Sequence, residues 1–189
     1  MSETLKGETE MYVAFGKALA TWAYVEWLHS ELFGLIASGQ AQNKPLQRAY
    51  WAIVSFDAKH KMVDAALREA LSKHPSYLAR WNNLSNRLHT KSKLRNRLAH
   101  AQLAEFHNEG VPNSLAMVTS IYASTKVGDD KKILLGNIQQ MDESFDRLGE
   151  DLLDFQKTYF TEQMTDTGRS IPRYVYPTEQ PGSRGSADG

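Results

Sequence analysis

Residues 11–37 read MYVAFGKALATWAYVEWLHSELFGLIA, and their apolar side chains recur every three or four positions. One stripe with this spacing consists of Phe15, Leu19, Trp22, Glu26, His29, Phe33 and Ile36. A neighbouring stripe consists of Val25, Leu28, Leu32 and Leu35. Such spacing is typical of a helix, and two adjacent stripes give it a wide buried face. The pattern predicts a long helix from Met11 to about Ala37, with Gly39 as its C-terminal cap.

Three more segments repeat this helical periodicity. They cover residues 45–73, 75–100 and 137–160. Short links between successive helices favour antiparallel packing of neighbours. The fold class that the sequence predicts is therefore all-α, an antiparallel four-helix bundle.

The helical pattern is interrupted between the third and fourth segments. Leu115–Ser124 is rich in Val, Thr, Ile and Tyr, Lys132–Leu135 is a second short apolar run, and turn residues separate them. We expect a small antiparallel sheet or β-hairpin as an insertion at about residues 103–136, before the last helix. One helical domain then spans residues 1–164. The Pro- and Gly-rich residues 165–189 are expected to form a C-terminal tail, partly disordered.

The composition excludes several kinds of site. The 189 residues hold 22 Lys and Arg against 22 Asp and Glu, so bulk charge indicates neither a nucleic acid nor a membrane as partner. The absence of cysteine excludes disulfides, thiolate metal sites and cysteine nucleophiles. The polar N-terminus lacks the order of a signal peptide, and no apolar run approaches the roughly 18–20 residues that span a bilayer. We expect a cytoplasmic protein without a membrane anchor.

Local charge is uneven although the total is balanced. No acidic residue lies between Glu69 and Glu105, whereas seven Lys and Arg and three His do. The fourth predicted helix, in contrast, is rich in Asp and Glu. Two explanations are open at this point. The basic helix packs near the acidic one and their charges complement each other, or the basic segment forms a local cationic surface for phosphate groups.

The end of the third predicted helix, residues 93–100, reads KLRNRLAH. Arg95, the polar Asn96 directly after it and His100 resemble the Arg-x4–6-His motif of HEPN domains. The resemblance extends in helix order from Met11 to about Phe160. It implies an all-α bundle that dimerises and acts as a metal-independent ribonuclease, as toxins, antiphage effectors and CRISPR-associated nucleases of this family do. The expected partners are RNA and a second copy of the chain, together with an antitoxin or regulatory protein if the role is toxin–antitoxin or phage defence.

The spacing of the motif limits how its residues can meet. Five residues of an ideal helix rotate by about 500°, so Arg95 and His100 project roughly 140° apart. For both to meet one phosphate, the helix must loosen at its end, or two copies must face each other. A two-fold dimer presents two Arg and two His to a single cleft, which agrees with the shared active site of the resembled family.

The residue types favour cleavage of RNA without a metal or a cofactor. RNA carries its own nucleophile, the 2′-OH, so a base and a cation suffice. His100 is the expected acid and base, Arg95 the phosphate clamp, and Asn96 a supporting group. The expected products are a 2′,3′-cyclic phosphate and a 5′-OH end. Further substrate-binding residues are expected at Arg97, Lys93, Lys91 and His89.

Charged residues on apolar helix faces need partners. Arg95 falls on the apolar seam of its helix, where an unpaired cation is costly. Glu26 is the candidate partner, in a buried ion pair with Arg95 or Arg87, although direct participation in catalysis is also open. His29 and His60 are expected to be hydrogen-bonded residues of the core.

Two other classes of function compete with the ribonuclease. The chain can be a HEPN-like module that binds RNA or a nucleotide without cutting it. It can also be a helical homodimer whose wide apolar faces serve only protein interaction. RNA affinity that falls with salt would separate the first from the second.

Overall fold

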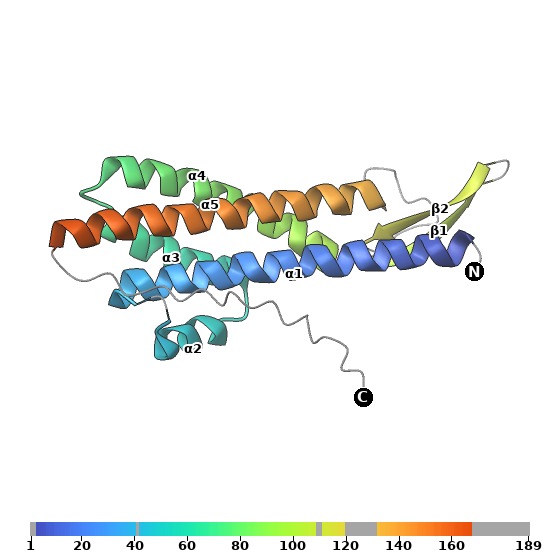
Figure 1. The fold of residues 1–189 in the computed structure, drawn as a ribbon. Coiled ribbons are helices and arrows are strands. Elements are labelled where there is room, and N and C mark those ends of the chain that lie inside the picture. The colour runs from blue at the N-terminus through green and yellow to red at the C-terminus, as the bar shows by residue number, and fades with distance from the viewer. Residues whose placement is uncertain (1–2, 41, 109–110, 120–131, 168–189) are drawn as a thin grey trace, which may run out of the picture.

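The computed structural model of the chain is mostly helical, with a small antiparallel sheet at one end of the helices (Figure 1). It describes residues 3–40, 42–108, 111–119 and 132–167. The helices are α1 (Glu3–Ser38), α2 (Lys44–Ala52), α3 (Phe56–Ala70), α4 (Pro75–Ala99) and α5 (Leu135–Thr167). The expected all-α class is confirmed. The described part of the chain nevertheless holds five helices, where the periodicity predicted four.

Helices α1 and α5 lie side by side along most of their length and form the long axis of the molecule (Figure 1). Helix α1 begins at Glu3, eight residues before the predicted start. The periodicity missed this part of the helix because its first turns are polar and carry no apolar stripe. It ends as predicted. Gly39 adopts a φ of 72°, in the left-handed region that suits glycine, and its N–H bonds to the carbonyl of Leu35 at 2.7 Å.

The prediction of one continuous helix over residues 45–73 is wrong. The chain leaves the helical conformation at Ile53, whose φ and ψ are −79° and 122°, and a new helix starts after Ser55. Ser55 is the N-cap of α3, and its hydroxyl accepts a hydrogen bond from the N–H of Ala58 at 3.1 Å. Two β-branched residues followed by a capping serine therefore separate α2 from α3.

The insertion before α5 is a three-stranded antiparallel sheet in the order β1-β2-β3, which confirms the expected small antiparallel sheet and adds a third strand to a simple hairpin. Its strands are β1 (Gln102–Asn108), β2 (Val111–Val118) and β3 (Lys132–Ile133). Met117 on β2 pairs with Leu103 on β1 and with Ile133 on β3. The expected strand end at residues 120–124 lies outside the described residues. So does most of the predicted tail, residues 168–189, whereas residues 165–167 still belong to α5.

The core lies between α1, α3, α4 and α5. Its largest fully buried side chains include Trp22, Trp81, Phe145 and Phe155. No helix in the described ranges is long and apolar enough to cross a membrane.

Charges complement each other between α4 and α5. Arg80 lies 2.8 Å from Asp154, and Arg87 lies 2.6 Å from Asp151. The expected complementarity is therefore confirmed for the N-terminal half of α4. The C-terminal part of α4, from Lys91 to Ala99, carries four further cations of the acid-free segment, Lys91, Lys93, Arg95 and Arg97.

Candidate functional site

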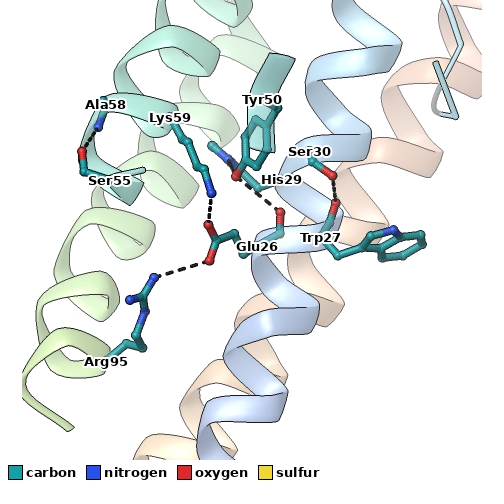
Figure 2. Close-up of polar contacts among 9 residues, drawn as sticks. All are labelled: Glu26, Trp27, His29, Ser30, Tyr50, Ser55, Ala58, Lys59 and Arg95. Carbon is teal, nitrogen blue, oxygen red and sulfur yellow. Dashed lines mark hydrogen bonds and ion pairs between the residues drawn. The ribbon is translucent and has the colours of Figure 1, made fainter. Parts of the chain in front are cut away.

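Three charged side chains from three helices meet beside the C-terminal part of α4 (Figure 2). Glu26 on α1 accepts a hydrogen bond from Lys59 Nζ on α3 at 2.6 Å and one from Arg95 Nη2 on α4 at 3.4 Å. The side chains of Glu26, Lys59 and Arg95 are 11%, 6% and 24% exposed. We call these three residues the Glu26 cluster. It is largely enclosed, and Arg95 is its most accessible member.

Aromatic rings hold both cations of the Glu26 cluster in place. The Lys59 ammonium lies 4.3 Å from the ring centroid of Trp51 and 5.0 Å from that of Tyr50. The Arg95 guanidinium lies 5.6 Å from the ring of Trp22. Ring faces attract cations, and the attraction grows as water is removed. These contacts compensate part of the cost of burying the two charges.

The Glu26 cluster carries one more positive than negative charge, because a single carboxylate faces two cations. Arginine stays charged at all ordinary pH values. The Nε atom of Arg95 is buried and has no hydrogen-bond partner among the described residues. A buried donor without a partner costs free energy. The cluster is thus suited to accept one further anion beside Arg95.

The structure places Glu26 next to Arg95 and not next to Arg87, which pairs with Asp151. Lys59, the third member of the cluster, is not among the site residues that the sequence analysis singled out. A signal was present in the sequence. Lys59 precedes Val63 and Leu67 at four-residue intervals, and all three are buried on one face of α3.

The other two residues of the motif face solvent. Asn96 and His100 are exposed, and neither side chain bonds to a described residue. The N–H of His100 still bonds to the carbonyl of Asn96 at 3.2 Å, in the α-helical pattern. Helix α4 therefore does not loosen before His100. On a regular helix Arg95 and His100 project about 140° apart, so a single chain does not direct both toward one point.

The four expected substrate-binding residues divide between two sides of α4. His89 and Lys93 are exposed beside α3, where His89 Nδ1 lies 4.0 Å from Asp57 Oδ1. Lys91 and Arg97 line a hollow on the side of α4 that faces β3 and α5. The basic end of α4 thus presents two separate cationic surfaces.

His29 and His60 belong to a buried hydrogen-bonded chain, which confirms that they are core residues. His29 Nδ1 lies 2.9 Å from the hydroxyl of Tyr50, and His29 Nε2 lies 3.3 Å from His60 Nδ1. His60 Nε2 lies 3.0 Å from the Ser85 hydroxyl, which donates to Asp64 at 3.0 Å. Because Ser85 donates its only proton to Asp64, it accepts from His60. With the Tyr50 hydroxyl donating to His29 Nδ1, the bonds of this chain are satisfied with both imidazoles neutral, and the longer contact of that hydroxyl with the Glu26 carbonyl, at 3.4 Å, receives no proton.

Burial explains the protonation state of this chain. It lowers the pKa of His29 well below the ordinary value, and the neighbouring His60 and Lys59 lower it further. It also lowers the pKa of His60 and raises that of Tyr50, because each charged form loses its hydration. The hydrogen-bonded side chains from Tyr50 to Ser85 are therefore uncharged at neutral pH, and the chain of hydrogen bonds ends at the Asp64 carboxylate.

Comparison with known proteins gives no match. No family model, no curated protein and no solved structure matches this chain. Among the described residues, no group of three or more His, Asp or Glu side chains is arranged to hold a metal ion.

Proposed function

We propose that the protein is a HEPN-like, metal-independent endoribonuclease that cuts RNA by attack of the 2′-OH, with a site shared across a homodimer. The observation that supports this proposal is the excess positive charge of the Glu26 cluster. The half-buried Arg95 is the most accessible member of this cluster, and Asn96 and His100 are exposed on the same helix. A scissile phosphodiester would supply the anion that the cluster lacks.

Lys59 makes Arg95 available to a phosphate. Glu26 is bound more closely by Lys59, at 2.6 Å, than by Arg95, at 3.4 Å. Because Lys59 neutralises the Glu26 carboxylate from the α3 side, Glu26 can position Arg95 and still leave some of the guanidinium N–H donors for a phosphate. The phosphorane carries more negative charge than the ground-state diester, so Arg95 would bind the transition state more tightly than the substrate.

His100 supplies the proton transfers. An exposed imidazole can remove the proton of the 2′-OH and later protonate the 5′-oxygen that leaves. Asn96 lies four residues before His100, on the same face of α4, where its amide can orient the imidazole or hold a ribose oxygen. Because Arg95 of the same chain projects elsewhere, His100 would act beside the Arg95 of a second copy.

The deciding experiment incubates purified protein with mixed RNA in EDTA. The wild type should cut and leave 2′,3′-cyclic phosphate and 5′-OH ends. Arg95→Ala and His100→Ala should each lose most of the activity, by about 100- to 10,000-fold for the proton-transfer residue. Arg80→Ala is the matched control, because it removes an exposed α4 arginine paired with Asp154, away from the cluster. Cutting that requires magnesium, or that persists in His100→Ala, would refute the mechanism.

A second function, RNA or nucleotide binding without cleavage, is favoured by one observation. Arg95 and His100 diverge on α4, so a chain that stays monomeric would hold a phosphate at Arg95 without placing an acid or base beside it. Such a module would bind RNA in a salt-dependent way and leave it intact under every condition.

A further inference from the structure

An exposed tryptophan lies directly beside the Glu26 cluster, on the last turn of α2. Trp51 is 47% exposed, whereas Trp22 and Trp81 are buried in the core. Val54, in the link from α2 to α3, is 98% exposed. Single exposed apolar residues are normal on protein surfaces, so the position of this pair is what matters. It places a small apolar surface next to cations to which the proposed function assigns a phosphate.

The ring of Trp51 has one covered face and one open face. Lys59 Nζ lies over the ring, 4.3 Å from its centroid, and the Lys59 side chain is itself buried. The face toward Lys59 therefore points into the protein, and the exposed part of the ring belongs to the other face and the edges. The ring of the buried Tyr50 meets that of Trp51 edge-on, at 5.2 Å between centroids. These contacts hold the indole in one orientation before any ligand binds.

Three short contacts join Trp51 to Arg95. The Trp51 ring lies on Lys59, which bonds to one carboxylate oxygen of Glu26 at 2.6 Å, and Arg95 lies 3.4 Å from the other oxygen (Figure 2). One dinucleotide is long enough to touch both the ring and the guanidinium. A nucleotide combines an anionic phosphate with a flat base, and proteins that bind single strands pair cations with exposed aromatic rings in the same way.

We infer that Trp51 is a stacking platform for an unpaired base of the RNA strand whose phosphate lies at Arg95. The inference rests on the proposed function, because it takes that strand to be the RNA that is cut. Stacking on a side chain needs a base with a free face, and the bases inside a duplex already stack on their neighbours. The substrate class is therefore single-stranded RNA or an unpaired loop. Because Lys59 and Tyr50 already orient the indole, stacking needs little further ordering of this side chain.

The test measures binding of two labelled strands of equal length by fluorescence anisotropy in EDTA. One is 2′-O-methyl oligoadenylate, which has no free 2′-OH and cannot be cut by the proposed reaction, and the other is the same backbone without bases. The wild type should bind the oligoadenylate roughly tenfold more tightly than the abasic strand. Trp51→Leu should lose most of this difference and bind the abasic strand as the wild type does. Trp51→Phe should keep much of it, because an aromatic ring remains.

Tyr12→Leu is the matched control, because it removes a similarly exposed aromatic ring near the start of α1. It should bind both strands as the wild type does. If Trp51→Leu binds the oligoadenylate as tightly as the wild type, the inference is overturned. An equal loss of affinity for both strands would also overturn it, because Trp51 would then act only by holding Lys59 in place.

The readouts separate this inference from the proposed function. If the wild type cuts no RNA but prefers the oligoadenylate through Trp51, the ribonuclease fails and the platform stands. If it cuts RNA and binds both strands equally, the platform fails and the ribonuclease stands. Offered a cleavable RNA hairpin, the wild type should cut the loop and leave the paired stem intact. Cutting of the stem at the same rate as the loop would overturn the choice of unpaired RNA as substrate.

Discussion

Glu26 lies between Lys59 and Arg95, so its removal leaves two cations facing each other in a largely enclosed space. We expect Glu26→Gln to lower the free energy of unfolding by about 3 kcal/mol, because an uncompensated buried charge is costly. Denaturant unfolding followed by circular dichroism measures this change. A melting curve identical to that of the wild type would mean that Glu26 does not neutralise the two cations.

A matched control distinguishes burial from charge alone. Asp57→Asn also removes a carboxylate bound to a lysine, Lys61 at 2.7 Å, but that pair is exposed. It should change stability by less than about 1 kcal/mol. The double variant Glu26→Gln with Lys59→Met should be less destabilised than the sum of the single changes, because each partner is costly mainly when the other is absent.

The buried histidines predict a loss of stability in mild acid. Their pKa values are lowered in the folded protein, whereas an unfolded histidine titrates near its ordinary value of about 6.5. Below that pH, His29 and His60 bind protons in the unfolded chain but stay neutral in the folded protein. Stability should therefore fall as the pH drops from 7 through 6 toward the lowered pKa values.

Unfolding free energies between pH 7.5 and 5 measure this effect. The carboxyls of Asp57, Asp64 and Asp142 have pKa values lowered from the ordinary aspartate value of 3.8, so they affect stability in a more acidic range. These carboxyls therefore do not obscure the change in stability that the histidines cause between pH 7 and 5. A stability that stays level or rises between pH 7 and 5 would contradict neutral, buried imidazoles.

At the level of elements, the start of α3 depends on a single side chain. The Ser55 hydroxyl accepts the N–H of Ala58, one of the donors that a helix start leaves unpaired. Ser55→Ala should destabilise the protein by about 1 kcal/mol, while Ser55→Asp should retain most of the stability. Thermal melts of the two variants make the comparison, and equal losses in both would show that the cap is unimportant.

The helices were more predictable than the breaks between them. Apolar spacing located α1, α4 and α5 because their stripes pack directly on the core. The same spacing continues across Ile53–Ser55, because Tyr50 before the break and Phe56 after it are both buried. The spacing therefore concealed the end of α2. Strand β1 lies within the expected insertion, but no separate apolar run marked it, because strand formation depends on its pairing partner β2 beyond a turn.

At the level of the whole molecule, the site was predictable only in part. Glu26 and Arg95 stood out as charges on apolar helix faces, so their meeting followed from the need of a buried charge for a partner. The burial of Lys59 did not follow in this way. Tyr50 and Trp51 lie against its ammonium only because the chain turns between α2 and α3. That turn is a tertiary feature without a periodic signal.

The proposed shared site predicts a homodimer in which Arg95 and His100 act from opposite chains. The α-helical bond from the N–H of His100 to Asn96, at 3.2 Å, keeps the two side chains about 140° apart on one copy of α4. Sedimentation at micromolar concentration should therefore give a mass of about twice 21.3 kDa. A clean monomer that still cuts RNA would exclude the shared site.

Mixing two inactive variants tests the pairing itself. In a dimer of one Arg95→Ala chain and one His100→Ala chain, the first supplies His100 and the second supplies Arg95 to the common cleft. Subunit exchange should therefore restore part of the cleavage that each variant lacks alone. A chain carrying both substitutions is the control, because mixing it with either single variant leaves one of the two groups absent from the cleft. If the mixed dimer forms and stays inactive, Arg95 and His100 must act from the same chain, and the end of α4 must then unwind to bring them together.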